Sequence, residues 1–262
     1  MRTSRLKALW AVVSLLVIAP LGVSFAQNAA PPANIRTLVQ AIQLKPGRAA
    51  EWRALQRDEV MPALKKAGVT TRVTLETLFG DTNEYVTLRP LTNFAEFDDQ
   101  QGLLQRVLGA KAGDALAAKL ADCTASTQRY IITQQGALAI TTNAGPIYVT
   151  TRYRLADGPG GGAAFADFLS GEVMPMMQQA KTAGRIAGWG VSITNQGAEE
   201  QGLRILTTYY PNLAALDAVT AAGGVAQATL GQAEAQTLAT KQARLVTVVR
   251  TAIRRRIADL SY

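Results

Sequence analysis

Hydrophobic and polar residues alternate along several short stretches of the chain, a pattern typical of strands that are buried on one face. In residues 147–155, for example, Ile147 and Val149 fall on one side while Tyr148 and Arg152 fall on the other. Between such stretches lie longer segments with apolar residues at helical spacing. The patterns predict the order strand, helix, strand, strand, helix, strand, and they predict it twice. The expected extended runs are 35–44, 70–79, 84–90 and 125–134, then 146–156, 185–194, 203–211 and 242–253, and the expected first helices are 46–67 and 159–182.

The two copies are also visible in the residues themselves. The segment "KPGRAAEWRALQRDEVMPALKKAG" (45–68) aligns with "GPGGGAAFADFLSGEVMPMMQQAKTAG" (158–184), and both contain the tetrapeptide EVMP. Farther along, "NFAEFD" corresponds to "NLAALD", and their first residues, Asn93 and Asn212, are well placed as N-caps of the second helical regions. The chain is therefore expected to be a tandem repeat.

One βαββαβ unit has a four-stranded sheet with helices on a single face, so its other face needs a cover. A second copy is the simplest cover. We therefore expect an α+β protein in which two ferredoxin-like βαββαβ units pack sheet to sheet as an intrachain pseudo-dimeric α/β barrel. The expected division is a signal peptide in 1–26, a disordered mature N-terminus in 27–34, a first unit in 35–135, a linker in 136–145 and a second unit in 146–256.

The N-terminus predicts export. Three cations precede an uncharged run over residues 8–21, and the small residues Ser24 and Ala26 stand where a signal peptidase cleaves. We interpret residues 1–26 as a secretory signal and expect the mature chain in the periplasm or outside the cell, without membrane contact after cleavage. An uncleaved anchor is the alternative, but the run is shorter than the about 20 residues that a span prefers.

Charge adds little once the signal is removed. The chain has 27 Lys and Arg against 19 Asp and Glu, and loss of three cations leaves 24 against 19, a net charge of +5. Part of the excess is Arg250, Arg254, Arg255 and Arg256, which we interpret as a solvated terminal turn, with contact to a phosphate surface as the alternative. Aromatic residues make up only 6% of the chain. Without stacking aromatics among the basic residues, we expect no nucleic-acid binding.

The absence of histidine from the sequence excludes several kinds of site. It removes the usual general base, the usual proximal haem ligand, imidazole-dependent triads and most zinc sites. We therefore expect no metal and no cofactor. The single cysteine, Cys123, is expected to be a small buried apolar residue because it has no partner for an internal disulfide.

The run "LKPGRAAEWRALQRDEVMPALKKAG" followed by "FGDTNEYVTLRPLTNFAEFD" resembles the NIPSNAP family within the dimeric α/β-barrel superfamily. The resemblance covers most of residues 35–135 and extends more loosely to the second copy, where "GLRILTTYY" replaces the "NEYVTL" pattern. It implies a fold rather than a reaction. Related barrel proteins include small monooxygenases and haem-handling enzymes, and the latter rely on an axial histidine that this chain lacks.

The repeated EVMP raises a question about its acid. A helical wheel places Glu59 in the apolar stripe of the first helix and Glu172 in that of the second. Because Pro62 and Pro175 lack the amide that closes the helical ladder, each helix is expected to kink there, and the acid ahead of the kink can accept bonds from freed amides. We favour this structural role. A role of the acids as base or ligand contact, or simple exposure, are the alternatives.

Strand alternation predicts which residues face the space between the sheets. We expect Val73 and Leu75 to pack under the helices, and Gly190 to leave room on the opposite side. The candidates for a ligand site on that opposite side are Arg72, Glu76, Tyr85, Arg89, Arg152, Arg154 and Arg204. Such a cluster suits a carboxylate or a phosphate. The alternative is that these arginines pair with acids or solvent at the barrel rim, and Trp189 is expected in the core.

Two functions are compatible with these residues. The leading interpretation is an exported, NIPSNAP-like, noncatalytic barrel protein that binds a small anionic or amphipathic ligand or a protein partner. The alternative is a cofactor-free oxygenase or isomerase of the dimeric α/β-barrel type, in which Arg, Tyr or Glu holds an activated substrate anion. A third possibility is a homo-oligomer that assembles through its outer strand edges.

Overall fold

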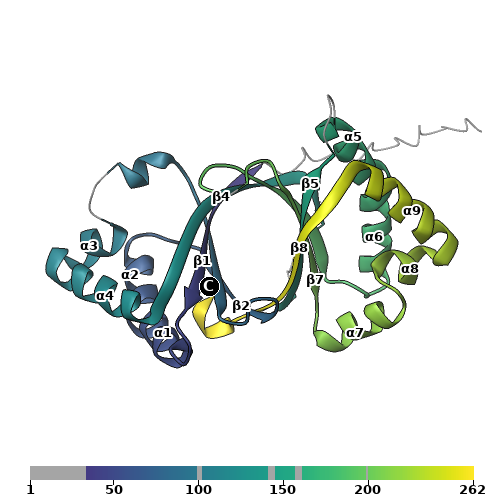
Figure 1. Ribbon diagram of the computed structural model, residues 1–262. Helices are drawn as coiled ribbons and strands as arrows, with labels where there is room; N and C mark the ends of the chain where they lie inside the picture. The colour runs from purple at the N-terminus through teal and green to yellow at the C-terminus, as the bar shows by residue number, and fades with distance from the viewer. Residues whose placement is uncertain (1–33, 99–101, 141–144, 157–160, 199) are drawn as a thin grey trace, which may run out of the picture. The chain divides into compact units, whose positions relative to one another are not determined.

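The computed structural model describes residues 34–98, 102–140, 145–156, 161–198 and 200–262. Within these residues, eight strands form one closed antiparallel barrel, seen nearly end-on in Figure 1. The protein is therefore α+β, as the sequence predicts. The strands are β1 (Ile35–Leu44), β2 (Val73–Phe79), β3 (Glu84–Pro90), β4 (Thr124–Ile140), β5 (Ile147–Leu155), β6 (Gly188–Thr194), β7 (Arg204–Tyr210) and β8 (Val246–Arg256).

The barrel is made from two four-strand sheets with the same internal order. The first half is arranged β4-β1-β3-β2 and the second β8-β5-β7-β6. The two sheets are joined edge to edge, by β2 with β8 and by β4 with β6. This differs from two stacked sheets, because hydrogen bonding at both seams pairs every sheet edge and gives the two inner faces one shared lumen.

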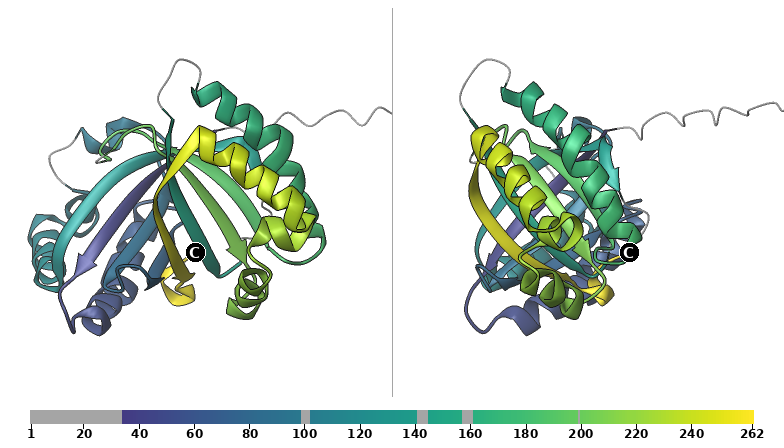
Figure 2. Two further views of the ribbon diagram at one scale, coloured as in Figure 1. Left: turned by 45° about the vertical axis from the view of Figure 1, so that its right-hand side comes forward. Right: turned by 90° about the vertical axis from the view of Figure 1, so that its right-hand side faces the viewer.

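Helices cover the outer face of each sheet (Figure 2). Those of the first half pack over β1 to β4 and those of the second half over β5 to β8. The α-helices are α1 (Ala49–Leu55), α2 (Met61–Lys66), α3 (Leu103–Leu108), α4 (Ala110–Cys123), α5 (Gly161–Phe168), α6 (Met174–Thr182), α7 (Leu213–Ala221), α8 (Val225–Leu230) and α9 (Gln232–Leu245).

The core consists of two outer clusters and one in the lumen. Under the first set of helices, Trp52 packs on Tyr85, and under the second set Trp189 and Phe165 are fully buried, so the prediction for Trp189 is confirmed. The lumen cluster includes Leu75 and Ile205, one from each half of the chain. Because residues of both halves meet in it, burial of the lumen depends on the closed barrel.

Each EVMP tetrapeptide begins within a π-helical turn. The turns η1 (Gln56–Val60) and η3 (Leu169–Val173) connect α1 to α2 and α5 to α6. The first proline of the following helix, Pro62 or Pro175, cannot donate to the preceding turn, and a widened turn relieves the clash of its ring. The expected irregularity of both helices is thus a π turn.

The predicted caps differ in their outcome. The Asn212 side chain accepts a 2.8 Å hydrogen bond from the amide of Ala215, so it caps α7 as expected. Asn93 precedes a short 3₁₀ turn, η2 (Phe94–Phe97), and makes no side-chain cap bond. The second copy therefore follows the capping rule more closely than the first.

Strand β4 and the turn that follows β8 each contact the other half of the chain. β4 continues to Ile140, so residues 136–140 of the expected linker are part of a strand that pairs with β6. After β8, the 3₁₀ turn η4 (Ala258–Leu260) packs on the first half, where Thr74 Oγ1 donates a 2.6 Å hydrogen bond to the Leu260 carbonyl.

The expected signal segment, residues 1–26, lies outside the described residues. In the part of the chain that the structure describes, no helix combines the length and the apolar character needed to cross a bilayer.

Candidate functional site

The predicted arginine cluster divides between two faces of the barrel. In the second half, the prediction for β5 holds, since Tyr153 packs toward Phe165 under the helices and Arg152 lies in the lumen. In the first half, the assignment of faces is reversed. Val73 and Leu75 belong to the lumen cluster, whereas Glu76 and Tyr85 lie under α1.

On the outer face, Glu76 and Tyr85 contact one arginine that the sequence analysis did not single out. Arg53 of α1 pairs with Glu76 and donates to Tyr85 Oη at 3.0 Å. Arg255 of β8 completes the arrangement by pairing with the other oxygen of Glu76. Glu76 is therefore neutralised by two guanidinium groups at the junction of helix and barrel, outside the lumen.

The remaining outer arginines are separated from one another. Arg72 is 5% exposed and donates a 2.6 Å hydrogen bond to Gln56 Oε1. Burial, with a smaller effect of the nearby charge of Arg89, lowers the pKa of Arg72 to about 10. Arg89 pairs with Glu96 at 2.5 Å, and Arg204 donates to the carbonyl of Gly202 at 2.7 Å. The prediction that these arginines share one concavity with Arg152 is wrong.

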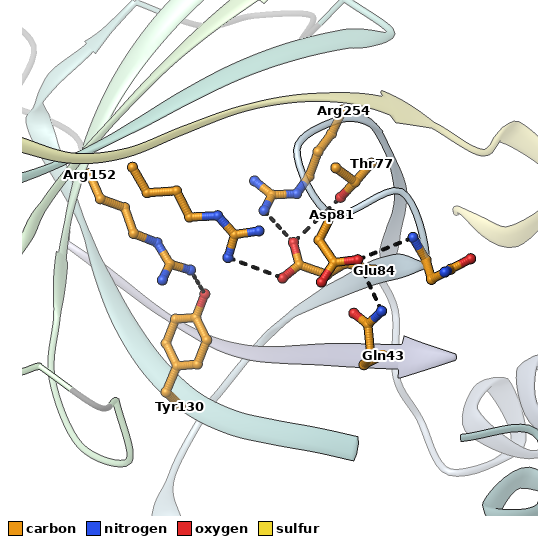
Figure 3. Close-up of polar contacts among 9 residues, drawn as sticks. Gln43, Thr77, Asp81, Glu84, Tyr130, Arg152 and Arg254 are labelled. Atoms are coloured by element: carbon orange, nitrogen blue, oxygen red, sulfur yellow. Dashed lines mark hydrogen bonds and ion pairs between the residues drawn. The ribbon is translucent and has the colours of Figure 1, made fainter. Parts of the chain in front are cut away.

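The lumen holds two polar contacts that span it (Figure 3). Arg152 of β5 donates a 2.7 Å hydrogen bond to Tyr130 Oη of β4, and Arg254 of β8 donates a 2.6 Å hydrogen bond to Glu84 Oε1 of β3. Neither pair lies on neighbouring strands. Arg254 and Glu84 reach past one strand, β2, and Arg152 and Tyr130 reach past two, β6 and β7. Both contacts join the two halves of the chain.

The arginines of β8 were interpreted as a solvated terminal turn, and that interpretation is wrong. Arg250 and Arg254 are on β8 and reach the same acid, Glu84, at 3.4 and 2.6 Å. Arg256 is the direct partner of Leu75, a lumen residue, so it shares the lumen face. The spacing of two residues in "RTAIRRR" was the available signal for a strand.

Two tyrosines form an uncharged wall of the lumen. The rings of Tyr148 and Tyr209 meet edge to face with centroids 4.8 Å apart. Burial raises the pKa of both phenols, so both are neutral near pH 7. A Cβ placed on Gly190 would lie 3.9 Å from Tyr209 Oη, which confirms that this glycine faces the lumen.

A pocket of about 210 Å³ opens beside the Arg152–Tyr130 pair. The Thr194 hydroxyl is bound within its own loop, since it donates a hydrogen bond to the Glu200 carbonyl and accepts one from the Leu203 amide. The Arg154 guanidinium hydrogen-bonds Glu200 and holds the pKa of that carboxyl below its ordinary value. The lining residues are Gln128, Tyr130, Arg152, Thr194, Ala198, Glu200, Leu203 and Val249.

A larger groove of about 550 Å³ lies outside the barrel, between α5 with η3 and α9. Its charged lining includes Glu172, which pairs with Lys241 at 2.7 Å. The first copy has the same pair, Glu59 with Lys119 at 2.9 Å. All four side chains are more than a third exposed, so solvent screens both pairs. We place the site in the lumen because Tyr130, Glu84 and Arg254 are buried there.

The tetrapeptide acids thus contact the neighbouring helix. Glu59 and Glu172 bond lysine side chains of α4 and α9, and neither η1 nor η3, nor the helices that follow them, have a side-chain cap. Among the described residues, no group of three or more Cys, Asp or Glu side chains is arranged to hold a metal ion.

Comparisons with known proteins identify the fold. No family model and no curated protein matches the sequence. A protein provisionally named a monooxygenase, from Lactobacillus acidophilus NCFM, superposes with a TM-score of 0.54 at 9% identity, covering 86% of this chain and 94% of that chain. An anthrone oxidase-like protein superposes with a TM-score of 0.52 at 12% identity, covering 85% of this chain and 91% of that chain. A similarly named monooxygenase of Fusobacterium nucleatum superposes with a TM-score of 0.53 at 10% identity, covering 85% of this chain and 92% of that chain.

These likenesses support the dimeric α/β-barrel fold that the sequence predicts. They overturn the leading interpretation of function. We expected a noncatalytic barrel that binds a ligand or a partner, but the similar structures are named for oxygenases and an oxidase.

Proposed function

We propose that the protein is a cofactor-free oxygenase whose active site is the lumen pocket beside Arg152 and Tyr130. The observation that carries the proposal is the 2.7 Å hydrogen bond between these two side chains, which crosses the barrel at the wall of a cavity. The names of the three similar structures support an oxygenase over an isomerase.

The direction of the bond gives each group a role. Because a guanidinium only donates, Tyr130 Oη accepts a hydrogen bond from Arg152, and the hydroxyl hydrogen of Tyr130 points elsewhere. A phenol polarised in this way by a cation is a stronger donor to an oxyanion. Arg152 and Tyr130 together therefore stabilise negative charge on a substrate oxygen in the pocket.

The substrate arrives already ionised, because the two acids near the pocket are held by arginine. Glu84 is bound by Arg254 and Arg250, and Glu200 is bound by Arg154, so both carboxylates are already engaged by guanidinium groups. A phenol or enol that is acidic near neutral pH meets this condition. Its negative charge is shared between oxygen and a carbon that bears hydrogen.

The reaction then needs only dioxygen. The substrate carbon bonds to O₂ and forms a peroxide anion, which is protonated to a hydroperoxide. Loss of the remaining C–H proton and cleavage of the O–O bond leave a carbonyl on that carbon and release hydroxide, which takes a proton and becomes water. One oxygen atom enters the product and the other enters water. The substrate supplies all four electrons, so no reductant is required.

Three broader assignments accompany this proposal. The repeated element order and the equal strand order of the two halves support tandem ferredoxin-like units. The resemblance of residues 35–135 to NIPSNAP proteins is a proposal about the family, and the signal in residues 1–26 supports export to the periplasm or beyond. Finding residue 27 as the N-terminus of the protein recovered from its host would support export.

An oxygen electrode tests the function directly. Purified protein treated with a chelator is given 1,3-cyclohexanedione at pH 7, and 1,3-dihydroxybenzene and anthrone at pH 9, where part of each is ionised. We expect oxygen uptake with a one-ring compound and a loss of about tenfold or more in Tyr130→Phe. Tyr153→Phe, which changes a tyrosine under the helices, is the control and retains the rate. Absence of uptake across a wider series of acidic phenols and enols would overturn the proposal.

A further inference from the structure

Two arginines face each other inside the barrel: Arg250 forms an ion pair with Glu84 at 3.4 Å, and Arg152 forms none with the acids that the structure describes. Arg152 of β5 and Arg250 of β8 are direct partners in the antiparallel pair, so their side chains leave the sheet on the same face. That face is the lumen, since Arg152 reaches Tyr130 across it and Arg250 reaches Glu84. Like charges at directly opposed positions are destabilising unless an anion lies near them.

The lumen as a whole has more positive charge than it neutralises. Arg152, Arg250, Arg254 and Arg256 share the lumen face, and among the residues that the structure describes, only Glu84 forms an ion pair with any of them. One carboxylate thus stands against four guanidinium groups. Tyr148 and Tyr209 do not supply charge, because burial keeps them protonated.

Arg254 gives an independent sign of an unfilled role. Its side chain is only 6% exposed, yet its Nε has no hydrogen-bond partner among the described residues. The Nε of Arg256 is also buried and also has no hydrogen-bond partner among the described residues. A buried guanidinium with a free donor is costly, and such donors are usually satisfied by an acceptor.

The pocket limits the size of a ligand that could neutralise these arginines. Arg152 lines it, and Arg250 follows another lining residue, Val249, in β8. A volume of about 210 Å³ is below the range of roughly 300–1,000 Å³ for drug-sized ligands. It suits a compact molecule with one ring.

We propose that the substrate of this oxygenase is a one-ring hydroxylated carboxylic acid, whose carboxylate binds between Arg152 and Arg250. This inference rests on the proposed function and adds the substrate class. Planar guanidinium groups recognise carboxylates through paired hydrogen bonds, and a substrate with this second charge neutralises the opposed arginines. Arg250 is then a specificity-determining residue, since it contacts the carboxylate and not the reacting carbon.

The test compares binding of two matched probes without turnover. Calorimetry under nitrogen measures 2,4-dihydroxybenzoate and 1,3-dihydroxybenzene, which differ by one carboxylate. We expect the acid to bind the wild-type protein about tenfold more tightly or better, and we expect Arg250→Gln to remove this preference while changing the affinity for the neutral probe by less than about threefold. Arg255→Gln, a neighbour on the outer face of the same strand, keeps the preference.

A second readout separates this role from a structural one. If Arg250 were kept for stability, Arg250→Gln would lower the melting temperature of the ligand-free protein. We expect an unchanged or higher melting temperature, because the substitution removes a like-charge contact and leaves Glu84 paired with Arg254. Equal binding of both probes, tighter binding of phenyl phosphate than of benzoate, or a clear fall in melting temperature would overturn the inference.

Failure of the inference and failure of the proposed function give different results. A carboxylate preference without oxygen uptake from any probe contradicts the oxygenase and leaves the binding site. Oxygen uptake with neutral one-ring phenols, together with equal affinity for acid and neutral probes, contradicts the substrate class and leaves the oxygenase.

Discussion

Glu84 Oε1 accepts a 2.6 Å hydrogen bond from Arg254 Nη2 in the lumen of the barrel, although the two residues are 170 positions apart in the chain. The contact joins β3 of the first half to β8 of the second. Both side chains are nearly buried, with exposures of 12% and 6%. Loss of one partner from such a buried pair costs more stability than loss of one partner from the exposed pairs on the helices.

Replacement of Glu84 is expected to destabilise the fold strongly. Glu84→Gln leaves Arg254 buried beside Arg250 without a counter-charge, and loss of one partner of a buried pair typically costs about 3–5 kcal/mol. Urea unfolding monitored by tryptophan fluorescence measures the free energy of unfolding. A loss below about 1 kcal/mol would show that the lumen is well hydrated, contrary to the burial described above.

The acids of the two tetrapeptides are expected to contribute little to stability or activity. Glu59 and Glu172 form pairs with lysines at the protein surface, and such pairs are worth about 0–1 kcal/mol. Glu59→Gln and Glu172→Gln should therefore unfold within about 1 kcal/mol of the wild-type protein and keep its rate of oxygen uptake. If Glu172→Gln alone abolished uptake, the site would belong in the outer groove.

The tyrosines are expected to titrate late as pH rises. Burial raises the pKa of Tyr210 to about 12, and it also raises the pKa values of Tyr148 and Tyr209. Because these values exceed the ordinary value near 10, the folded state keeps protons that the unfolded state has lost. Their contribution to stability is therefore complete below pH 10 and is lost as pH rises toward 12.

An absorbance titration of tyrosinate, with circular dichroism in parallel, checks this order of events. We expect part of the tyrosine signal to appear only together with loss of structure. Reversible ionisation of every tyrosine near pH 10 in a folded protein would contradict the burial of the lumen phenols.

Cys123 is expected to resist thiol reagents. The side chain is fully buried, and burial raises the pKa of its thiol, so little reactive thiolate is present. A disulfide reagent at pH 8 should modify the native protein slower than the urea-unfolded protein by about tenfold or more. Equal rates would show that α4 opens readily near its C-terminal end.

The element order and the repeat could be predicted from the sequence because they rest on local patterns. The π turns were only partly predictable. Pro62 and Pro175 indicate an irregular helix, but both a kink and a widened turn can accommodate a proline that lacks the backbone amide. The pairing of each preceding glutamate with a lysine depends on the neighbouring helix, which the pattern of one helix does not contain.

The faces of the strands show why the site was harder to predict. In a closed barrel with outer helices, both faces of a strand are buried, so apolar residues do not distinguish lumen from helix side. Leu75 therefore faces the lumen, while Glu76 is neutralised under α1 by Arg53. The correct assignment needed a long-range contact. The Arg152–Arg250 pairing was hidden for the same reason, since β5 and β8 are far apart in the chain.

The most direct test of the central claim, that an ionised substrate reacts with dioxygen beside Arg152 and Tyr130, is mass spectrometry of the product formed under ¹⁸O₂. The account predicts that the chelator-treated wild-type protein incorporates one labelled atom per product molecule and that Arg152→Gln loses this reaction. Label that enters from water instead of dioxygen, or equal incorporation by Arg152→Gln, would contradict it.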